Sequence, residues 1–385
     1  MKILVVLPRG TVTRTFGGAE IQAIKTTKFL GQIGISADIV EAEATEKSLL
    51  TCDIIHIFDH TDAFFSSRAT KKTRKKLVFT PIYWPEKGKR NIIQKIQTYL
   101  TLENSQFLFN QLRKPYSMTF YLAWRFIPDW VSPLRNTIGQ FWLYPFRVAD
   151  IIVVNSIVEK TILLDIAEHE VQSKTKIVYN GVDEEVYGRP ITEKLRDLFP
   201  SKYKLTNYVL SIGRIEPRKN QLMLVHACKK LDLPCILIGR PYDRYYAQKV
   251  FKELEDAKIQ YRYIRYLTPD SDMLLSAYLN AKIVALPSKF ETPGLVALEA
   301  ASLGRTVVVT KIGSAPEYFK DNAYYVDPED ENNITETIQN AWQNPFDAER
   351  IRKFVLENYT WKKTAQSISQ IYQELVTKEK RGQDS

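Results

Sequence analysis

The stretch Ser288-Lys-Phe-Glu291-Thr-Pro-Gly294-Leu-Val-Ala-Leu-Glu299-Ala-Ala-Ser-Leu-Gly304 decides the fold expected of this 385-residue sequence. The apolar run at 283–287 before it predicts a buried strand, and the run at 295–303 predicts a helix that ends at Gly304. Glu291 then lies in the loop before the helix, and Glu299 lies about one turn inside it. Because a helix N-terminus offers free N–H groups and the positive end of its dipole, this unit predicts an anion site suited to a diphosphate.

The two carboxylates of this stretch suggest what else the anion carries. Glu291 and Glu299 stand eight positions apart, one on each side of the helix start. An ionised carboxylate accepts hydrogen bonds, such as those from sugar hydroxyls, about twice as strongly as a neutral acceptor does. A diphosphate with a polyol on each side describes a nucleotide-sugar.

The same stretch resembles the E-x7-E signature of the retaining glycosyltransferases of family 4, among the group 1 glycosyl transferases, which have the two-domain GT-B fold. Further segments resemble those of the family in the same chain order, namely Phe16–Glu20, Val153–Ser156, Asn180–Asp183, Ile212–Asn220 and Leu286–Ser288. Several ordered motifs are far less probable by chance than one. The resemblance covers most of the chain and implies two Rossmann-like α/β domains that face each other across a cleft.

The alternation of short β-branched runs and helical patterns supports this fold class. Strands are predicted at Ile3–Leu7, Ala37–Val40, Ile54–Phe58, Leu77–Thr80 and Ile151–Val154, then at Tyr208–Ile212, Cys235–Ile238, Tyr261–Tyr266, Ile283–Leu286 and Thr306–Thr310. Helices are predicted at Glu20–Ile33, Asn220–Leu231, Asp272–Asn280 and Leu295–Leu303.

The domain boundaries follow from this alternation and from the resemblance. We expect an N-terminal acceptor-side domain over 1–187 and a nucleotide-sugar-binding domain over 188–360, joined by a linker around Gly188–Pro200. The segment Trp361–Lys378 resembles the terminal helix of the family, which packs back on the first domain.

The composition argues against several other classes of protein. Hydrophobic residues make up 44% of the chain and charged residues 25%, as is ordinary for a globular protein. The three cysteines and four histidines show no metal-ligand spacing, and no Asp-x-Asp pair follows a predicted strand, so neither a metal nor another cofactor is expected. The first apolar run is too short for a signal peptide, and no run reaches the roughly 18 residues of a membrane span. We therefore expect a cytoplasmic protein with reduced thiols.

One segment, at about 85–148, breaks the alternation with aromatic and basic side chains, and the basic run Lys71–Lys76 lies just upstream. On a chain with a formal charge of +10, this region suits peripheral contact with an anionic membrane. The alternative is a helical insertion whose rings are core and whose lysines are solvated. No recognition motif accompanies the charge, so nucleic acid is not an expected partner.

The resemblance implies roles for two cations of the second half. Arg214 and Lys219 follow a predicted strand and would neutralise the departing diphosphate, which fixed cations can do in place of a metal. The alternative for both is a surface ion pair with Glu216. Arg218 is the competing cation and is expected to face solvent.

The carboxylates have roles implied in the same way. Glu299 resembles the family's ribose-binding carboxylate, and Glu291 resembles the carboxylate that contacts the donor sugar. The nucleotide-sugar would also meet the backbone donors of the helix start, which are Gly294, Leu295 and Val296. The sequence departs from many family members here, because Thr292-Pro293 stands where they have Gly-Phe.

The N-terminal half offers fewer signals. Gly17 and Gly18 lack a Cβ, so the backbone could approach a phosphate or an acceptor closely. The histidine common in the family is missing from the segment 78–84, while His56 is expected to be buried within a strand. The remaining catalytic candidate is His60, and the acceptor-side candidates are Tyr83, Trp84 and Asn155.

These expectations combine into a metal-independent, retaining glycosyltransferase. It would move a sugar from a UDP- or GDP-sugar to a hydroxyl of a glycan, soluble or lipid-linked, as in polysaccharide biosynthesis. Family analogy implies attack on the face from which the diphosphate departs, with a diphosphate oxygen taking the proton. Two alternatives stay open, a nucleotide-sugar hydrolase or epimerase on the same fold and a non-catalytic nucleotide-sugar-binding scaffold.

Overall fold

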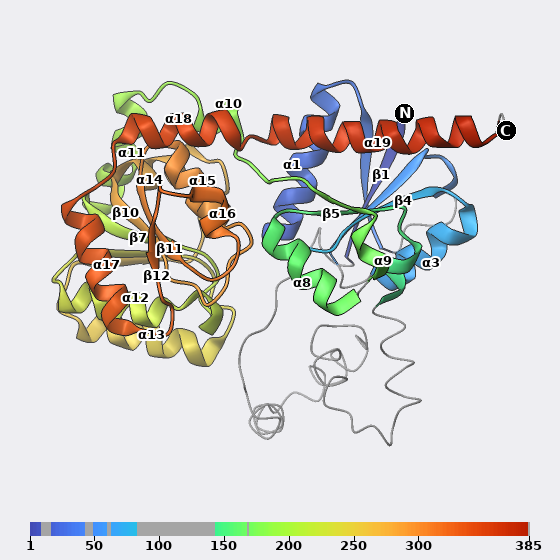
Figure 1. Cartoon of the computed structure of the whole chain (residues 1–385). Coiled ribbons are helices and arrows are strands. Elements are labelled where there is room, and N and C mark those ends of the chain that lie inside the picture. The colour runs from blue at the N-terminus through green and yellow to red at the C-terminus, as the bar shows by residue number, and fades with distance from the viewer. Residues whose placement is uncertain (9–16, 43–48, 60–62, 83–142, 168, 384–385) are drawn as a thin grey trace, which may run out of the picture. The chain divides into compact units, whose positions relative to one another are not determined.

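A computed structural model describes residues 1–8, 17–42, 49–59, 63–82, 143–167 and 169–383 (Figure 1). The chain forms two compact units. The first consists of Met1–Val154, Lys160–Ile177 and Ile368–Ser385, and the second of Asn155–Glu159 and Val178–Ser367. Each unit holds a six-stranded sheet whose strand pairs are all parallel.

The sheet of the first unit has the order β2-β1-β3-β4-β5-β6. Its strands are β1 (Lys2–Leu7), β2 (Ser36–Glu41), β3 (Ile54–Phe58), β4 (Lys76–Thr80), β5 (Ile151–Val154) and β6 (Thr175–Ile177). Its helices are α1 (Gly18–Gln32), α3 (Ala63–Thr73), α8 (Ile157–Ala167), which begins in the second unit, and α9 (His169–Gln172). The central strands β1, β3, β4 and β5 read as continuous apolar runs because helices shield both faces of a parallel sheet.

The sheet of the second unit has the order β12-β11-β10-β7-β8-β9. Its strands are β7 (Tyr208–Ile212), β8 (Cys235–Ile238), β9 (Tyr261–Ile264), β10 (Ala281–Leu286), β11 (Thr306–Thr310) and β12 (Tyr324–Val326). One face is covered by α12 (Gln221–Lys230), α13 (Arg244–Asp256) and α17 (Glu331–Gln343). The other is covered by α11 (Glu193–Tyr203), α14 (Asp272–Asn280), α15 (Leu295–Ser302) and α18 (Ala348–Asn358). The short elements are α10 (Glu184–Tyr187), the 3-10 turn η2 (Pro217–Lys219) and α16 (Ala315–Phe319).

The predicted α/β fold with two parallel-sheet units is confirmed, and all ten predicted strands are present. Two strands were missed, β6 and β12, because three residues are too short to show an apolar pattern. The predicted linker at Gly188–Pro200 is wrong. The side chain of Thr192 caps α11, which continues through Pro200, and this whole stretch lies within the Val178–Ser367 part of the second unit.

The last helix, α19 (Trp361–Gln383), starts in the second unit, and its residues from Ile368 onward belong to the first. The hydroxyl of Tyr372 lies 2.6 Å from Nδ1 of His56 on β3, and Thr80 Oγ1 on β4 lies 2.7 Å from Nε2. His56 is fully buried, as the strand pattern predicted. Both ring nitrogens therefore have a partner, and α19 is joined to two strands of the first sheet.

Candidate functional site

The candidate residues of the second unit gather where parallel strands end. Arg214 and Lys219 follow β7, and Glu291 follows β10, which is the neighbour of β7 in the sheet. The carboxyl ends of parallel strands share one edge, and ligands of such sheets bind outside that edge. The sheet order thus brings together side chains that are 72 positions apart in the sequence.

Lys219 and Glu291 form a buried ion pair. Lys219 Nζ lies 2.5 Å from Glu291 Oε1, and the two side chains are only 16% and 7% exposed. The hydroxyl of Ser288 donates to the same oxygen at 2.6 Å, and Arg218 Nη1 lies 3.9 Å from it. Burial by itself would raise the pKa of Glu291, but Lys219 and Arg218 outweigh burial and hold the pKa below its ordinary value. Burial lowers the pKa of Lys219, and Glu291 opposes that shift.

The two arginines of the segment share one carboxylate. Glu216 Oε1 lies 3.5 Å from Arg214 Nη2 and 3.0 Å from Arg218 Nη2, and the guanidinium of Arg214 also stacks 4.5 Å above the ring of Tyr242. The expectation that Arg218 faces solvent is wrong. The η2 turn directs it toward the loop after β10, where it donates to the carbonyl of Phe290 at 3.2 Å. The alternative ion pair with Glu216 is present for Arg214, whereas Lys219 pairs with Glu291.

The backbone around Glu291 depends on two glycines. Gly294 precedes α15 with a φ of +76°, a conformation that glycine adopts without strain. A Cβ at Gly313 would lie 2.2 Å from the carbonyl oxygen of Glu291, so only glycine allows this close approach. Leu295 and Val296 form the first turn of α15, where the N–H groups have no carbonyl partner within the helix. The predicted helix start is therefore present next to the loop that carries Glu291.

Glu299 lies further along α15, on the side of α14. The hydroxyl of Tyr278 donates to its Oε2 at 2.6 Å. The charges of Glu299 and Asp270 both act on Tyr278 and on the neighbouring Tyr187, and burial is the main cause that raises the pKa of each hydroxyl. Neither tyrosine belongs to a sequence motif. Only the packing of α10 and α14 in the core of the second unit reveals them.

In the first unit, the expected glycine loop leads into α1. Gly17 is the N-cap residue, and its N–H donates to Glu20 Oε2 at 2.8 Å. A Cβ at Gly17 would lie 2.9 Å from that oxygen, whereas a Cβ at Gly18 would meet nothing within 4 Å. His60, Tyr83 and Trp84 lie outside the described residues, as does most of the segment 85–148.

Asn155, the remaining acceptor-side candidate, directly follows β5 and is grouped with the second unit. It is only 1% exposed. Its carbonyl accepts from the Tyr318 hydroxyl at 2.7 Å, while its side-chain oxygen and nitrogen have no hydrogen-bond partner in the described part of the chain. A buried amide without partners is unusual in a folded protein and is consistent with a ligand or water contact.

Residues 197–360 match the family described as Glycosyl transferases group 1. This chain thus holds, within its second unit, a stretch that belongs to the group 1 glycosyltransferases. It is 29% identical to a D-inositol 3-phosphate glycosyltransferase of Mycolicibacterium smegmatis, over 58% of this chain and 52% of that protein. It is 35% identical to the O-antigen chain mannosyltransferase B of Escherichia coli, over 37% of this chain and 39% of that protein. The chain thus spans about half the length, or less, of these curated relatives.

Solved structures extend the likeness to the whole fold. Anabaena HepE in complex with UDP and glucose superposes with a TM-score of 0.70 at 16% identity, over 97% of this chain and all of that one, and a sucrose-phosphate synthase of Thermosynechococcus elongatus gives 0.69 at 16% identity, over 98% and 100%. The fold of this chain is therefore GT-B. Assignment to family 4 is consistent with the D-inositol 3-phosphate glycosyltransferase relatives.

The described residues contain no group of three or more His, Cys, Asp or Glu side chains placed to hold a metal ion. Within the same ranges, none of the helices combines the length and the apolar character that crossing a bilayer requires.

Proposed function

We propose that this chain is a retaining glycosyltransferase that moves a sugar from a nucleoside-diphosphate sugar to a hydroxyl of a glycan. The observation that carries the proposal is the cluster at the carboxyl edge of the second sheet. Arg214 and Lys219 supply fixed positive charge, and Glu291 lies within hydrogen-bond distance of Lys219. Glu299 follows on α15, whose N-terminus opens on the same loop. Cations, helix N-terminus and two carboxylates are what a nucleotide-sugar requires.

The chemistry assigns a task to each group. The bond between the anomeric carbon and the diphosphate oxygen breaks, and negative charge develops on that oxygen. Lys219 and Arg214 stabilise this charge, and Lys219 must turn from Glu291 toward the diphosphate to do so. The acceptor oxygen then bonds to the anomeric carbon on the face that the diphosphate leaves. The acceptor's proton passes to the departing oxygen, so no side chain has to act as nucleophile.

Glu291 and Glu299 would bind the two polyols of the donor. When Lys219 turns away, Glu291 retains Ser288 and Arg218 as partners and can accept hydroxyls of the donor sugar. Glu299 would accept the ribose hydroxyls. We propose that fixed cations replace a metal here and that no cofactor is needed. The neighbour solved with UDP and glucose, the D-inositol 3-phosphate glycosyltransferase and the mannosyltransferase support the reaction class. They do not fix the sugar or the acceptor.

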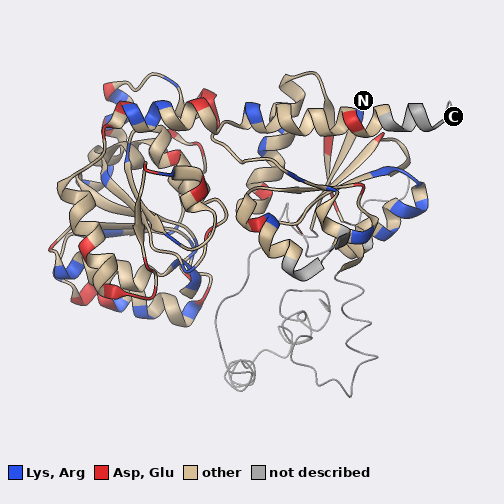
Figure 2. Ribbon diagram, viewed as in Figure 1, with Lys and Arg blue, Asp and Glu red and all other residues tan. Residues whose placement is uncertain are grey.

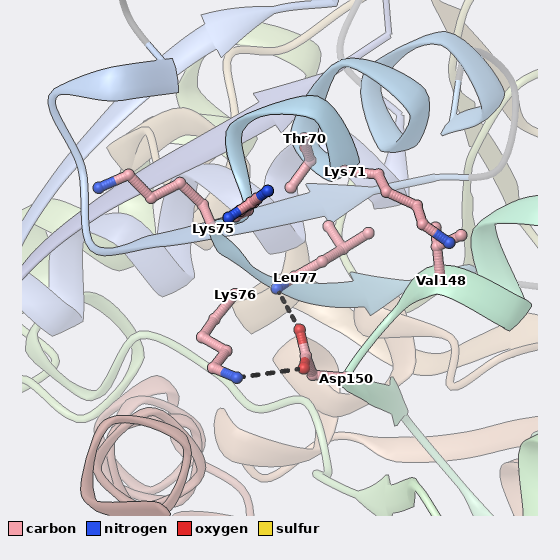
Figure 3. A pocket seen from close by; sticks show the side chains of 8 residues that line it. Thr70, Lys71, Lys75, Lys76, Leu77, Val148 and Asp150 are labelled. Atoms are coloured by element: carbon pink, nitrogen blue, oxygen red, sulfur yellow. Dashed lines mark hydrogen bonds and ion pairs between the residues drawn. The ribbon is translucent and has the colours of Figure 1, made fainter. Parts of the chain in front are cut away.

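We further propose peripheral contact of the first unit with an anionic membrane on the cytoplasmic side, where a lipid-linked acceptor would be met. Figure 2 shows the Lys and Arg residues along α3 and the start of β4. The lining of a cavity of about 150 Å³ there includes four cations and one carboxylate, which are Lys71, Arg74, Lys75, Lys76 and Asp150. Figure 3 shows Lys76 reaching toward Asp150 at 3.7 Å, whereas Lys71 and Lys75 extend away from it. Cations that point apart suit an extended charged surface better than one small anion.

The proposed function is tested by binding and product analysis. A nucleoside diphosphate at about 100 times its dissociation constant should stabilise the chain by roughly 2.7 kcal/mol, so a thermal-shift panel of UDP, GDP and ADP identifies the base. With the matching donor and a glycan acceptor, NMR of the product should show the anomeric configuration of the donor. Donor turnover that needs no acceptor would favour a hydrolase or an epimerase, and binding without any turnover would favour a scaffold.

A further inference from the structure

The ribose-side carboxylate is held from behind by a buried tyrosine. Tyr278 lies on α14 and is fully buried, and its hydroxyl donates to Glu299 Oε2 at 2.6 Å. Both residues belong to the second unit, and their helices α14 and α15 cover the same face of its sheet. The contact therefore reaches from the core of this unit to a carboxylate that is itself partly exposed.

This hydrogen bond suits the task of holding a carboxylate in place. Burial, followed by the charge of Glu299, raises the pKa of Tyr278 well above its ordinary value, so the hydroxyl keeps its proton and can only donate it to the acceptor. A hydrogen bond to an ionised acceptor is stronger than one between neutral groups. A carboxylate has about four lone-pair sites, so one donor fixes its orientation without saturating it.

The position of Tyr278 is well determined by its surroundings. Its ring packs with Tyr187 at 6.5 Å between centroids, in an edge-on arrangement, and its neighbour Ala277 is tied through its carbonyl to the hydroxyl of Tyr208 on β7 at 2.7 Å. A donor that is held on two sides can hold Glu299 in turn. Without this hydrogen bond, the long Glu299 side chain would lose its rotamer freedom only when a ligand binds, which would weaken binding.

We propose that Tyr278 is a positioning residue, which orients Glu299 to accept the ribose hydroxyls of the nucleotide. This proposal rests on the proposed function, in which Glu299 contacts the ribose. It places one determinant of nucleotide affinity in the core of the second unit, where no sequence motif marks it. Its signature is an effect on binding that depends on the ribose hydroxyls.

The test compares Tyr278→Phe with the wild type, using UDP and 2′,3′-dideoxy-UDP or, if the chain prefers it, the guanosine pair. Loss of a hydrogen bond to a charged group predicts about tenfold weaker binding of the ribonucleotide by calorimetry. The dideoxy nucleotide has no hydroxyls for Glu299, so its affinity should change less than about twofold. Tyr324→Phe is the matched control, because it removes a tyrosine hydrogen bond of similar length, to the carbonyl of Asn344 at 2.7 Å, elsewhere in the second unit.

The outcomes separate the two proposals. A tenfold loss that appears with both nucleotides, or one that Tyr324→Phe reproduces, would mean that Tyr278 acts only through the fold and would overturn the positioning role. An unchanged affinity of Tyr278→Phe would overturn it as well. A wild type that binds both nucleotides equally would refute the ribose contact of Glu299, and a wild type that binds no nucleoside diphosphate would refute the proposed function itself.

Discussion

At the scale of single residues, two opposite charges of the candidate site pair with each other, so a ligand that binds either one has to separate them. Lys219 is the expected diphosphate cation, yet its ammonium group lies on Glu291, the expected sugar carboxylate. Each group neutralises the charge of the other. Because a charge buried without a partner costs several kcal/mol, the pair keeps either group from being buried alone, and under the proposed function the diphosphate and the sugar would replace these partners.

The cations should matter for turnover more than for folding. Arg214 is 39% exposed on its side chain, so Arg214→Ala should leave the unfolding temperature nearly unchanged while turnover falls about 10²–10³-fold. Lys289→Ala removes an exposed cation from the neighbouring loop and serves as the control. Steady-state kinetics on both variants provides the measurement, and equal activity of the two would contradict the role of Arg214.

The buried pair should be visible in stability. Lys219→Met leaves Glu291 with only Arg218 nearby and should reduce the free energy of unfolding by about 2–3 kcal/mol. Adding Glu291→Gln removes the uncompensated charge and should restore most of that loss. Denaturant titration of both single variants and of the double variant measures the free energy of unfolding of each. A double variant as unstable as the sum of the two single changes would show that the residues do not interact.

The two carboxylates should separate in a binding assay. Glu299→Ala should weaken binding of the bare nucleoside diphosphate about tenfold, since the ribose belongs to that ligand. Glu291→Gln should not weaken it, because the change releases Lys219 for the diphosphate, yet sugar transfer should fall. Calorimetry with the diphosphate, together with transfer rates, provides the comparison. Equal losses of affinity in both variants would remove the distinction.

At the scale of elements, α19 is fixed to the first sheet by a histidine that stays neutral. Burial lowers the pKa of His56 to about 3, from an ordinary value of 6.5. In the unfolded chain the imidazole takes up a proton below about pH 6.5, and in the folded chain it does not. His56 therefore stabilises the fold above pH 6.5, and this contribution is lost as the pH falls toward 3, at about 1.4 kcal/mol per pH unit.

This slope can be isolated between pH 7 and pH 5, where the lowered pKa of Glu291 keeps that carboxylate from titrating. The wild type should lose about 2 kcal/mol of stability over that range through His56. The variant His56→Gln keeps a donor and an acceptor for Thr80 and Tyr372 but cannot titrate, so its loss over the same range should be smaller by that amount. Parallel pH slopes in denaturant titrations of the two proteins would exclude the effect.

The elements also show how far sequence reasoning reaches. Mostly apolar runs of four or more residues, with β-branched side chains among them, identified the central strands, because a strand shielded on both faces has few polar positions. The three-residue strands β6 and β12 and the Pro-containing helix α11 carry no such signal. At the candidate site, the family resemblance and the positions after predicted strands singled out Arg214, Lys219, Glu291 and Glu299. Which cation pairs with which carboxylate depends on the order of β7 and β10 in the sheet, which spacing does not contain.

At the scale of the whole molecule, charge and chemistry are placed differently. The cations proposed to bind the diphosphate, Arg214 and Lys219, belong to the second unit and follow the carboxyl end of β7. The basic run of the first unit lies instead at the amino end of a strand, between the end of α3 and the start of β4. Ligands of parallel sheets bind at carboxyl ends. These cations are therefore not placed for the donor, and an anionic surface is the occupant we propose.

That surface makes a prediction about membranes. Lys71 and Lys75 line the cavity at α3, and the described residues offer neither of them a carboxylate partner. Near an anionic leaflet each cation contributes about 1 kcal/mol, so changing both to Gln should weaken binding to vesicles with anionic lipid about 30-fold. Binding should also fall as salt is added, since the Debye length shrinks from about 10 Å at 0.1 M to about 3 Å at 1 M.

The matched control changes two exposed lysines of α13 and the turn after it, Lys252 and Lys258, to Gln, which removes the same charge from the second unit. Co-sedimentation with neutral and with anionic vesicles, at low and at high salt, compares the two double variants. If the loss follows position, only the α3 variant detaches from anionic vesicles, and its turnover on a soluble acceptor is unchanged. If both variants lose the same affinity, the binding reflects only the net charge of +10. If the wild type does not sediment with anionic vesicles at low salt, α3 is an ordinary solvated helix and a soluble acceptor becomes the better proposal.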